Sequence, residues 1–191
     1  MTTEEEDHSL AMKLAISGIS MKFPSVKNIS TTKLHLWLGR QKSINDFNMQ
    51  DGPETHPVGQ LIVLDARPTH EYCVSHIPEA VRVDHEVKAE EILRNVPQLN
   101  IDTKATVVCY CSVGYRSSVV ADKLDKYFQQ QAAEQKKEKN VHVYNLEGSL
   151  FKWANEGRPM MDCNDQATKY AHPYNGVFGK LLKKEIRKGN L

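Results

Sequence analysis

The stretch TVVCYCSVGYRS at residues 106–117 decides the fold of this chain. Residues 106–110 form a short, continuous apolar run rich in β-branched side chains, which predicts a buried strand. Beyond the stretch no glycine or proline occurs until Gly148, and apolar side chains recur at helical spacing, at Val120, Leu124, Tyr127 and Phe128. The polar loop 111–117 is therefore expected to join the tip of a buried strand to a long amphipathic helix.

A cysteine lies at the mouth of this loop, where the local structure favours a thiolate. Cys111 faces the N-terminus of the predicted helix, and unpaired backbone N–H groups and the helix dipole stabilise negative charge there. Arg116 adds a permanent positive charge on the same turn. With Gly114 and Arg116 beside it, Cys111 is interpreted as a reactive thiol rather than a structural one. We therefore expect the loop to hold an anion on sulfur.

Strand and helix patterns alternate on both sides of this stretch. We expect further strands over residues 60–64, 80–83 and 141–144, and helices over residues 69–74, 84–96 and 147–156. One more helix is expected from Ser30 or Thr31, with Leu34, Trp37 and Leu38 on one face. This alternation predicts an α/β fold, with a mainly parallel central sheet and helices on both faces. In such sheets the ligand crevice lies at the carboxyl ends of the strands, which is where Cys111 falls.

The outer parts of the chain show weaker patterns. Residues 1–29 are interpreted as an N-terminal extension with one short amphipathic helix that ends at Gly18. Residues 30–160 are the predicted domain, and residues 161–191 are a C-terminal extension whose basic tail has a helical pattern over 180–188. The polar stretch 43–59 lacks periodicity and predicts a long loop, either a functional lid or an insert.

Composition and charge exclude several classes of function. The chain has 191 residues, 40% hydrophobic and 26% charged, which is ordinary for a globular protein. The net charge of +1 does not indicate nucleic acid or a membrane surface as a partner. No apolar run approaches the roughly 20 residues that a membrane helix needs. The acidic start is unlike a signal or transit peptide, so the expected location is cytoplasmic, with a mitochondrial location left open.

The four cysteines, at positions 73, 109, 111 and 163, have no disulfide-framework spacing and are expected to be reduced. Cys109 lies inside the apolar strand, which indicates a core position. The pairs Cys73 with His76 and Cys109 with Cys111 superficially resemble metal ligands. A zinc site needs converging ligands, and one of them here would be the expected nucleophile, so neither a metal nor a cofactor is predicted.

Three motifs resemble those of rhodanese domains and follow in the same order. The first is LDAR at 64–67, with EY at 71–72 and HIPEA at 76–80. The second is CSVGYRS at 111–117, which resembles the active-site loop of the family. The third is YNLEGS at 144–149 with Trp153 and GRP at 157–159, where the family usually has a second glycine in place of Ser149. Together the motifs extend the resemblance over roughly residues 30–160.

The resemblance implies a rhodanese-like single-domain sulfurtransferase of the thiosulfate sulfurtransferase family. Cys111 would attack the sulfane sulfur of a donor such as thiosulfate or mercaptopyruvate and form a cysteine persulfide. Cyanide, a small thiol or a protein thiol would then accept that sulfur. The resemblance also implies which residues bind the substrate, namely Ser112, Val113, Gly114, Tyr115, Arg116 and Ser117.

Each of these loop residues has an expected role. The N–H groups from about Ser112 to Arg116 would curl round the terminal sulfur as an anion nest. Gly114 would supply a turn position that a side chain would strain. Arg116 would hold an anionic donor or the persulfide charge, and Ser117 would cap the helix and donate to the sulfur.

Two alternatives stay open. Cysteine phosphatases, including those that share the rhodanese fold, place five residues between cysteine and arginine, whereas four separate Cys111 from Arg116. The shorter ring suits a single sulfur better than a tetrahedral phosphate, so phosphatase or arsenate-reductase chemistry is less favoured. The other alternative is a rhodanese-like binding or regulatory module with little turnover. In either case, Asp65 and Arg67 are expected to form a supporting ion pair that braces the loops.

Overall fold

Within the described residues, five parallel strands form one sheet in the order β1-β5-β4-β2-β3. The computed structural model describes residues 3–41 and 56–188, with side chains described for residues 10–40 and 56–188. The strands are β1 (Asn28–Ile29), β2 (Gln60–Asp65), β3 (Val81–Arg82), β4 (Ala105–Tyr110) and β5 (Val141–Leu146). Every strand predicted from the sequence is present, and the expected parallel α/β fold is confirmed. The two-residue strand β1 was not predicted.

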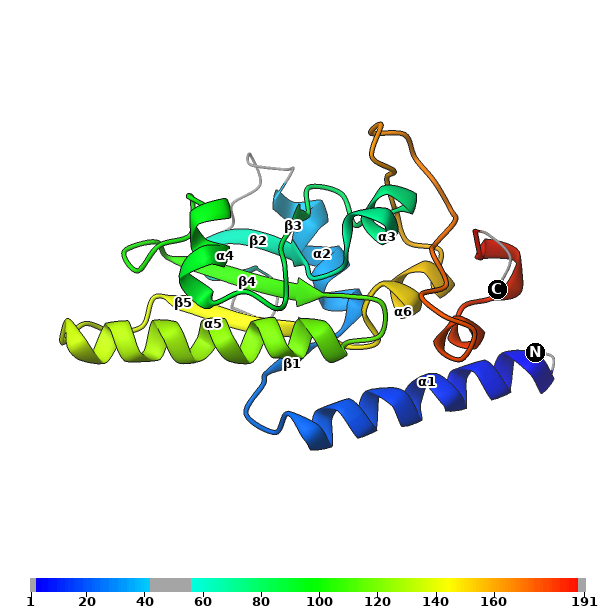
Figure 1. Cartoon of the computed structure of the whole chain (residues 1–191), viewed down its shortest axis with the longest axis horizontal. Helices are drawn as coiled ribbons and strands as arrows, with labels where there is room; N and C mark the ends of the chain where they lie inside the picture. Colours follow the sequence, from blue (N-terminus) through cyan, green and yellow to red (C-terminus); the bar gives the residue numbers. More distant parts are fainter. Residues whose placement is uncertain (1–2, 42–55, 189–191) are drawn as a thin grey trace.

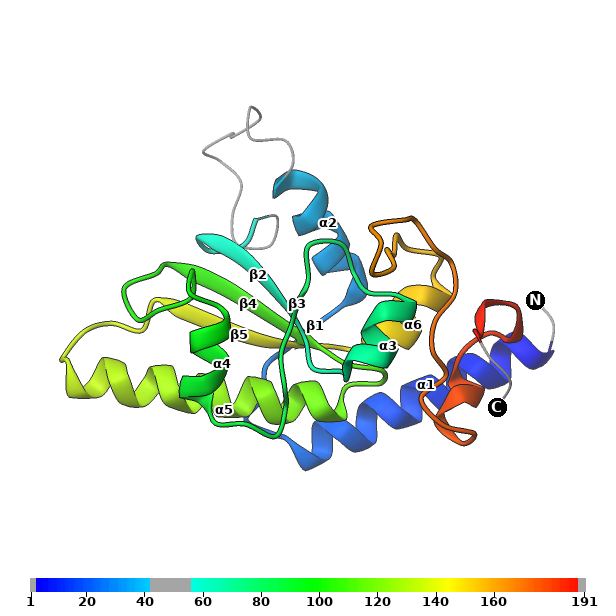
Figure 2. The same ribbon diagram turned by 45° about the horizontal axis from the view of Figure 1, so that its top comes forward.

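Helices cover both faces of the sheet (Figure 1). Helices α4 (Ala89–Asn95) and α5 (Tyr115–Glu134) cover one face, and α2 (Thr31–Gln41) and α6 (Ser149–Asn155) cover the other. The short helix α3 (Thr69–Val74) follows β2 as predicted. Helix α1 (Thr3–Lys22) packs against the core that lies on the α2 and α6 side of the sheet. It runs next to the 3-10 turn η1 (Phe178–Leu181) of the C-terminal segment (Figure 2).

The central strand β4 divides its side chains between two cores, because successive residues of a strand point to opposite faces. Val107 and Cys109 lie in the core that α5 completes with Leu124 and Phe128. The alternate residues of β4 lie in the other core, with side chains of α2 and α6. All six residues of β4 are buried, which is what a continuous apolar run predicts for a strand covered on both faces.

The carboxyl ends of β2, β4 and β5 meet at one edge of the sheet, and this edge positions the candidate site. In the strand register, Asp65 of β2 stands beside Tyr110 of β4, and Cys109 stands beside Asn145 of β5. Cys111 therefore leaves the sheet between the segments that follow β2 and β5. Parallel pairing thus gathers three stretches that are far apart in the sequence.

The N-terminal helix is longer than predicted. Helix α1 continues to Lys22, so Gly18 lies inside it and does not end it. A glycine in a helix interior costs only about 1 kcal/mol relative to alanine. Contacts of Met12 and Ile19 with the core offset that cost. Strand β1 then pairs with β5, so the sheet begins within the range assigned to the N-terminal extension.

Two further helices begin later than predicted. Helix α4 begins at Ala89 and not at 84 or 85, because the Asp84 carboxylate accepts a hydrogen bond from the Glu86 N–H at 2.9 Å and forms a local turn. Helix α6 begins at Ser149 and not at 147, because Gly148 takes the left-handed conformation with φ 68°.

The C-terminal segment returns to the domain. Met161 forms an antiparallel bridge with His76, and Ala171, Leu182 and Ile186 are buried in the core on the α1 side. The helical pattern expected over 180–188 is realised only as the short 3-10 turns η1 and η2 (Lys184–Ile186). A regular helix therefore does not form there, because core contacts of these apolar side chains select a bent path.

Most of the polar stretch 43–59 lies outside the described residues, so its role as a lid or an insert stays a prediction. Among the described residues, no helix combines the length and apolar character needed to cross a membrane.

Candidate active site

The loop after β4 is tighter than the sequence suggested. Helix α5 begins at Tyr115, so only residues 111–114 lie between strand and helix. Gly114 occupies the N-cap position with φ 121° and ψ −11°, a backbone conformation that side chains disfavour. The turn at Gly114, in a conformation that would strain a residue with a side chain, is thus present as expected. Residues 115–117, which we had assigned to the loop, form the first turn of the helix.

Cys111 is buried at the tip of β4, where hydrogen bonds hold its backbone and its sulfur. The Gly114 N–H donates to the Cys111 Sγ at 3.2 Å. The Cys111 N–H donates to the Ser149 Oγ at 3.2 Å, and the Cys111 carbonyl accepts from the Leu150 N–H at 3.0 Å. The first N–H groups of α5 have no acceptor within the helix, since a helix leaves its first turn unpaired. The sulfur therefore accepts one backbone N–H and lies at the N-terminus of α5.

Arg116 is bound to an acid that the sequence analysis did not single out. Its Nη1 and Nη2 donate to the two carboxylate oxygens of Glu71 at 2.8 and 2.9 Å. The Ser112 Oγ donates to the same carboxylate at 2.7 Å and accepts from the Arg116 Nη2 at 2.9 Å. This closed cluster differs from the expected arrangement, in which Arg116 points at an anionic donor.

The cluster is electrostatically coupled and largely out of water. The Glu71 side chain is 2% exposed and the Arg116 side chain 13%. Burial opposes both charges, yet the hydrogen bonds and attraction within the pair lower the pKa of Glu71 and raise the pKa of Arg116. Cys111 also contributes to the raised pKa of Arg116. The ring of Tyr174 covers the guanidinium face, with 4.7 Å from Cζ to the ring centroid.

Asp65 and Arg67 form the ion pair that the sequence predicted. The Arg67 Nη2 donates to the Asp65 Oδ2 at 2.6 Å, and both side chains are fully buried. The same nitrogen donates to the Ser75 carbonyl at 2.6 Å, which ties β2 to the end of α3. Burial acts against the charge of Arg67, but the attraction of Asp65 outweighs it and raises the pKa of Arg67. The pair braces the helix that carries Glu71.

Ser117 does not cap the helix, and that prediction was wrong. It lies inside the first turn of α5, where its Oγ donates to the Asn145 Oδ1 at 2.7 Å. Asn145 in turn donates to the Asn28 Oδ1 at 2.9 Å. The hydroxyl thus links α5 to β5 and β1, because the helix starts three residues earlier than the loop motif suggested. No donation from Ser117 to sulfur is present among the described contacts.

A cavity of about 440 Å³ opens above Cys111. Its wall includes Leu14, Ile19 and Lys22 of α1, and Tyr174 and Phe178 of the C-terminal segment. Side chains from both predicted extensions therefore enclose the thiol.

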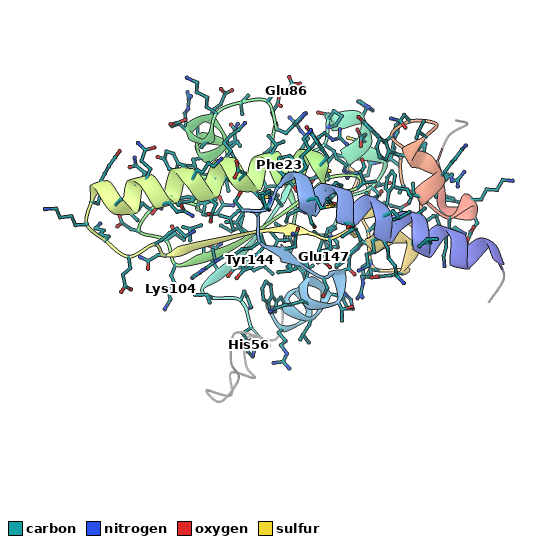
Figure 3. The ribbon with its side chains drawn as sticks, turned by 90° about the horizontal axis from the view of Figure 1, so that it is seen from below. Phe23, His56, Glu86, Lys104, Tyr144 and Glu147 are labelled. Atoms are coloured by element: carbon teal, nitrogen blue, oxygen red, sulfur yellow. The ribbon has the colours of Figure 1, made fainter. Side chains whose placement is uncertain are left out.

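The mouth of the cavity is held by ring contacts. Tyr115 lies at the mouth, edge-to-face with Phe23 at 5.3 Å between ring centroids. Phe23 follows α1 directly and lies beside α5 in the view from below (Figure 3). This contact anchors the C-terminal end of α1 to the first turn of α5.

The residues missed from the sequence divide into two groups. Glu71 lies in the first turn of a helix that follows a parallel strand, and strand ends of that kind converge, so its position carried a usable signal. The lining residues of α1, together with Tyr174 and Phe178, carried no such signal in the sequence, because no local pattern tells which distant segment will cover a loop.

The other cysteines lie away from the Cys111 loop or inside the core. Burial raises the pKa of the Cys109 thiol, in agreement with its predicted core position. Cys73 and Cys163 lie beside each other, and the hydrogen bond between them, with burial, raises the pKa of Cys73. Among the side chains of residues 10–40 and 56–188, no three His, Cys, Asp or Glu converge as metal ligands.

The fold and the site define a class, the α/β domains that carry a cysteine on a strand-to-helix loop at the carboxyl edge of a parallel sheet. Within that class, the chain belongs to the Rhodanese-like domain family. The family comparison matches residues 48–156, which is 109 of the 191 residues. This membership places the chain in the sulfurtransferase superfamily. No curated protein matches the sequence.

Several solved structures are similar to this one at low sequence identity. Thiosulfate sulfurtransferase from Pseudomonas aeruginosa has a TM-score of 0.49 and 17% identity, over 81% of this chain and 23% of that chain. A rhodanese-related protein from Thermoplasma volcanium has a TM-score of 0.43 and 19% identity, over 71% of this chain and 97% of that one. A rhodanese-like domain protein from Staphylococcus aureus has a TM-score of 0.41 and 19% identity, over 69% of this chain and 95% of that one.

Proposed function

We propose that this protein is a sulfurtransferase that carries sulfane sulfur as a persulfide on Cys111. The observation that carries the proposal is the placement of the Cys111 Sγ, which accepts the Gly114 N–H at 3.2 Å and lines a cavity of about 440 Å³. Backbone donors that converge on sulfur stabilise a thiolate before the reaction and a persulfide anion after it.

The reaction has two half-reactions. The Cys111 thiolate attacks the sulfane sulfur of a donor such as thiosulfate, a new S–S bond forms, and sulfite leaves with the electrons of the bond that breaks. A thiolate acceptor, or cyanide, then attacks the terminal sulfur, and Cys111 leaves as the thiolate. No net oxidation of the protein occurs, and ping-pong kinetics are expected.

The remaining site residues take positioning and binding roles in this proposal. The backbone of Ser112, Val113, Gly114, Tyr115, Arg116 and Ser117 surrounds the transferred sulfur as an anion nest. Through Glu71, the Arg116 side chain holds the loop in that shape. Asp65 and Arg67 support it one layer further out, by tying the end of β2 to the C-terminal end of α3.

The geometry of the site supports the two alternative functions less well than sulfur transfer. Bidentate binding of a tetrahedral oxyanion uses two guanidinium N–H groups, whereas both terminal nitrogens of Arg116 are already bound to Glu71. A rhodanese-like binding or regulatory module with little turnover would keep the fold but would not need a thiol that faces a cavity.

The test is to incubate the protein with thiosulfate, mercaptopyruvate and organic thiosulfonates, and to weigh it intact. One added sulfur atom is expected on the native protein and none on Cys111→Ser. The matched control is Cys163→Ser, which removes an exposed thiol outside the cavity and should leave the addition unchanged. If no donor adds sulfur, or if Cys111→Ser still gains it, the proposal fails. Phosphotyrosine and arsenate assays test the phosphatase alternative.

A further inference from the structure

The wall that faces Cys111 across the cavity is apolar. We call its five side chains, Leu14, Ala15, Ile19, Tyr174 and Phe178, the apolar cover. They come from α1 and from the C-terminal segment, which contact each other through η1. A small inorganic dianion gains nothing from contact with such a surface and loses hydration on approaching it.

Two cations line the described part of the cavity, and one of them is already compensated. Both terminal nitrogens of Arg116 are bound to Glu71, and Tyr174 covers the guanidinium face. The other cation, Lys22, lies with its Nζ 4.7 Å from the centre of the Tyr115 ring, at the mouth. The cavity therefore presents the positive charge of a single ammonium, which balances one negative charge and not two.

The size of the cavity also favours a ligand larger than a small inorganic anion. Cavities of about 300–1,000 Å³ typically enclose organic ligands with an apolar body. At about 440 Å³, this one is in that range and leaves apolar space unfilled around thiosulfate.

We propose that the sulfur donor is an organic sulfane-sulfur compound with an apolar alkyl or aromatic body and a single negative charge, in preference to thiosulfate. The inference rests on the proposed function and names the substrate class of the same site. The apolar body contacts the apolar cover, while the sulfur-bearing end reaches the Gly114 N–H and Cys111. In this proposal α1 and the C-terminal segment select the sulfur donor, and the Cys111 loop carries out the sulfur transfer.

Thiosulfonates are suitable probes, because their body varies while the reacting end stays constant. The Cys111 thiolate attacks the terminal sulfur of the thiosulfonate, the sulfur–sulfur bond to the sulfonyl group breaks, and a sulfinate leaves with its electron pair. Benzenethiosulfonate and methanethiosulfonate both carry one negative charge and both release a sulfinate. They therefore test the apolar body alone, and thiosulfate adds the comparison with a dianion.

The experiment measures the second-order rate of sulfur addition to Cys111 by intact mass for the three donors. Each rate is divided by the rate of the same donor with a free small thiol, which removes differences in intrinsic reactivity. Benzenethiosulfonate is expected to react about tenfold faster than methanethiosulfonate after this correction, since a buried ring contributes at least that much. Thiosulfate is expected to be the slowest of the three.

Two leucines on α1 provide a matched pair of variants. Leu14 lines the cavity, whereas Leu10 lies one turn away and does not; both are well exposed, at 65% and 58%. Leu14→Asn is expected to lower the corrected ratio of benzenethiosulfonate to methanethiosulfonate at least threefold. Leu10→Asn has the same helix propensity cost and should leave the ratio unchanged.

The outcomes separate the two proposals. Equal corrected rates for the thiosulfonates, a faster reaction with thiosulfate, or the same drop in ratio for both leucine variants would overturn the substrate class and leave the persulfide on Cys111 intact. Failure of every donor to add sulfur would overturn the proposed function itself. A high ratio that falls only in Leu14→Asn supports the inference.

Discussion

The Cys111 loop (residues 111–114) and the apolar cover lie on opposite sides of one cavity, and they are built in opposite ways. The loop is buried and joined to the fold by hydrogen bonds from α3, α5 and α6. The cover is made of partly exposed apolar side chains, with Tyr174 42% and Phe178 38% exposed and their two rings in contact. The difference implies that changes in the loop disturb folding and chemistry together, whereas changes in the cover act mainly on the choice of substrate.

Breaking the Glu71–Arg116 pair should have the largest effect on stability. Glu71→Gln leaves a largely buried guanidinium without its charge partner, which is expected to cost about 3 kcal/mol of the free energy of unfolding. Urea denaturation at neutral pH measures this cost. The matched control is Glu91→Gln on the exposed face of α4, with an expected change within about 0.5 kcal/mol. Equal changes in the two variants would mean that the pair does not hold the loop.

The same pair predicts a pH dependence. The pKa of Glu71 in the folded protein lies below its ordinary value of 4.5, so the carboxylate stabilises the fold above that pH. This stabilisation is lost as the pH falls from about 4.5 through the lower folded pKa. The stability difference between the native protein and Glu71→Gln should therefore be constant near neutral pH and shrink in acid. Urea midpoints across that range measure it, and a difference that grows in acid would contradict the assignment.

A substitution at Gly114, in the turn of the Cys111 loop, should have the next largest effect on the free energy of unfolding. Gly114→Ala places a side chain at φ 121° and is expected to cost about 1–2 kcal/mol. Gly176→Ala is the control, since Gly176 lacks a positive φ and a Cβ there meets nothing within 4 Å. Urea midpoints of the two variants measure the difference. Equal midpoints would show that the loop tolerates a side chain at its tip.

Ser149 tests how α6 supports the loop. Its Oγ accepts the buried Cys111 N–H at 3.2 Å, so Ser149→Ala should cost about 1–2 kcal/mol. Ser149 also has φ 50°, which glycine adopts without strain, so Ser149→Gly should cost less than Ser149→Ala. Thermal or urea unfolding of the two variants measures this order. The reverse order would mean that the backbone conformation is not strained.

The smallest effect on stability is expected in the cover. Tyr174→Leu removes the ring over Arg116 and should cost about 0.5–1 kcal/mol. Tyr170→Leu is a close match, because Tyr170 is 41% exposed but does not line the cavity, and its expected cost is lower. A loss at Tyr174 as large as that of Glu71→Gln would contradict the division between loop and cover.

Local sequence patterns account for the sheet and for the central part of the site. Continuous β-branched runs specify strands that are buried on both faces, and the Cys111 loop directly after such a run has to lie at the carboxyl edge. The buried Asp65–Arg67 pair was also predictable, because two opposite charges two residues apart at a strand end are within reach of each other. Helix ends were less predictable, since Asp84 and Gly148 act through local turns that compete with the helix pattern.

By itself, the sequence determined the class of fold, the cysteine proposed as nucleophile and the number of residues between it and Arg116, because each depends on residues that are neighbours in the chain. The tertiary structure alone decided that Glu71 neutralises Arg116 and that α1 and the C-terminal segment close the cavity over Cys111. Those contacts join residues tens to more than a hundred positions apart. No local pattern encodes them, since they arise only when strand pairing and core packing bring the segments together.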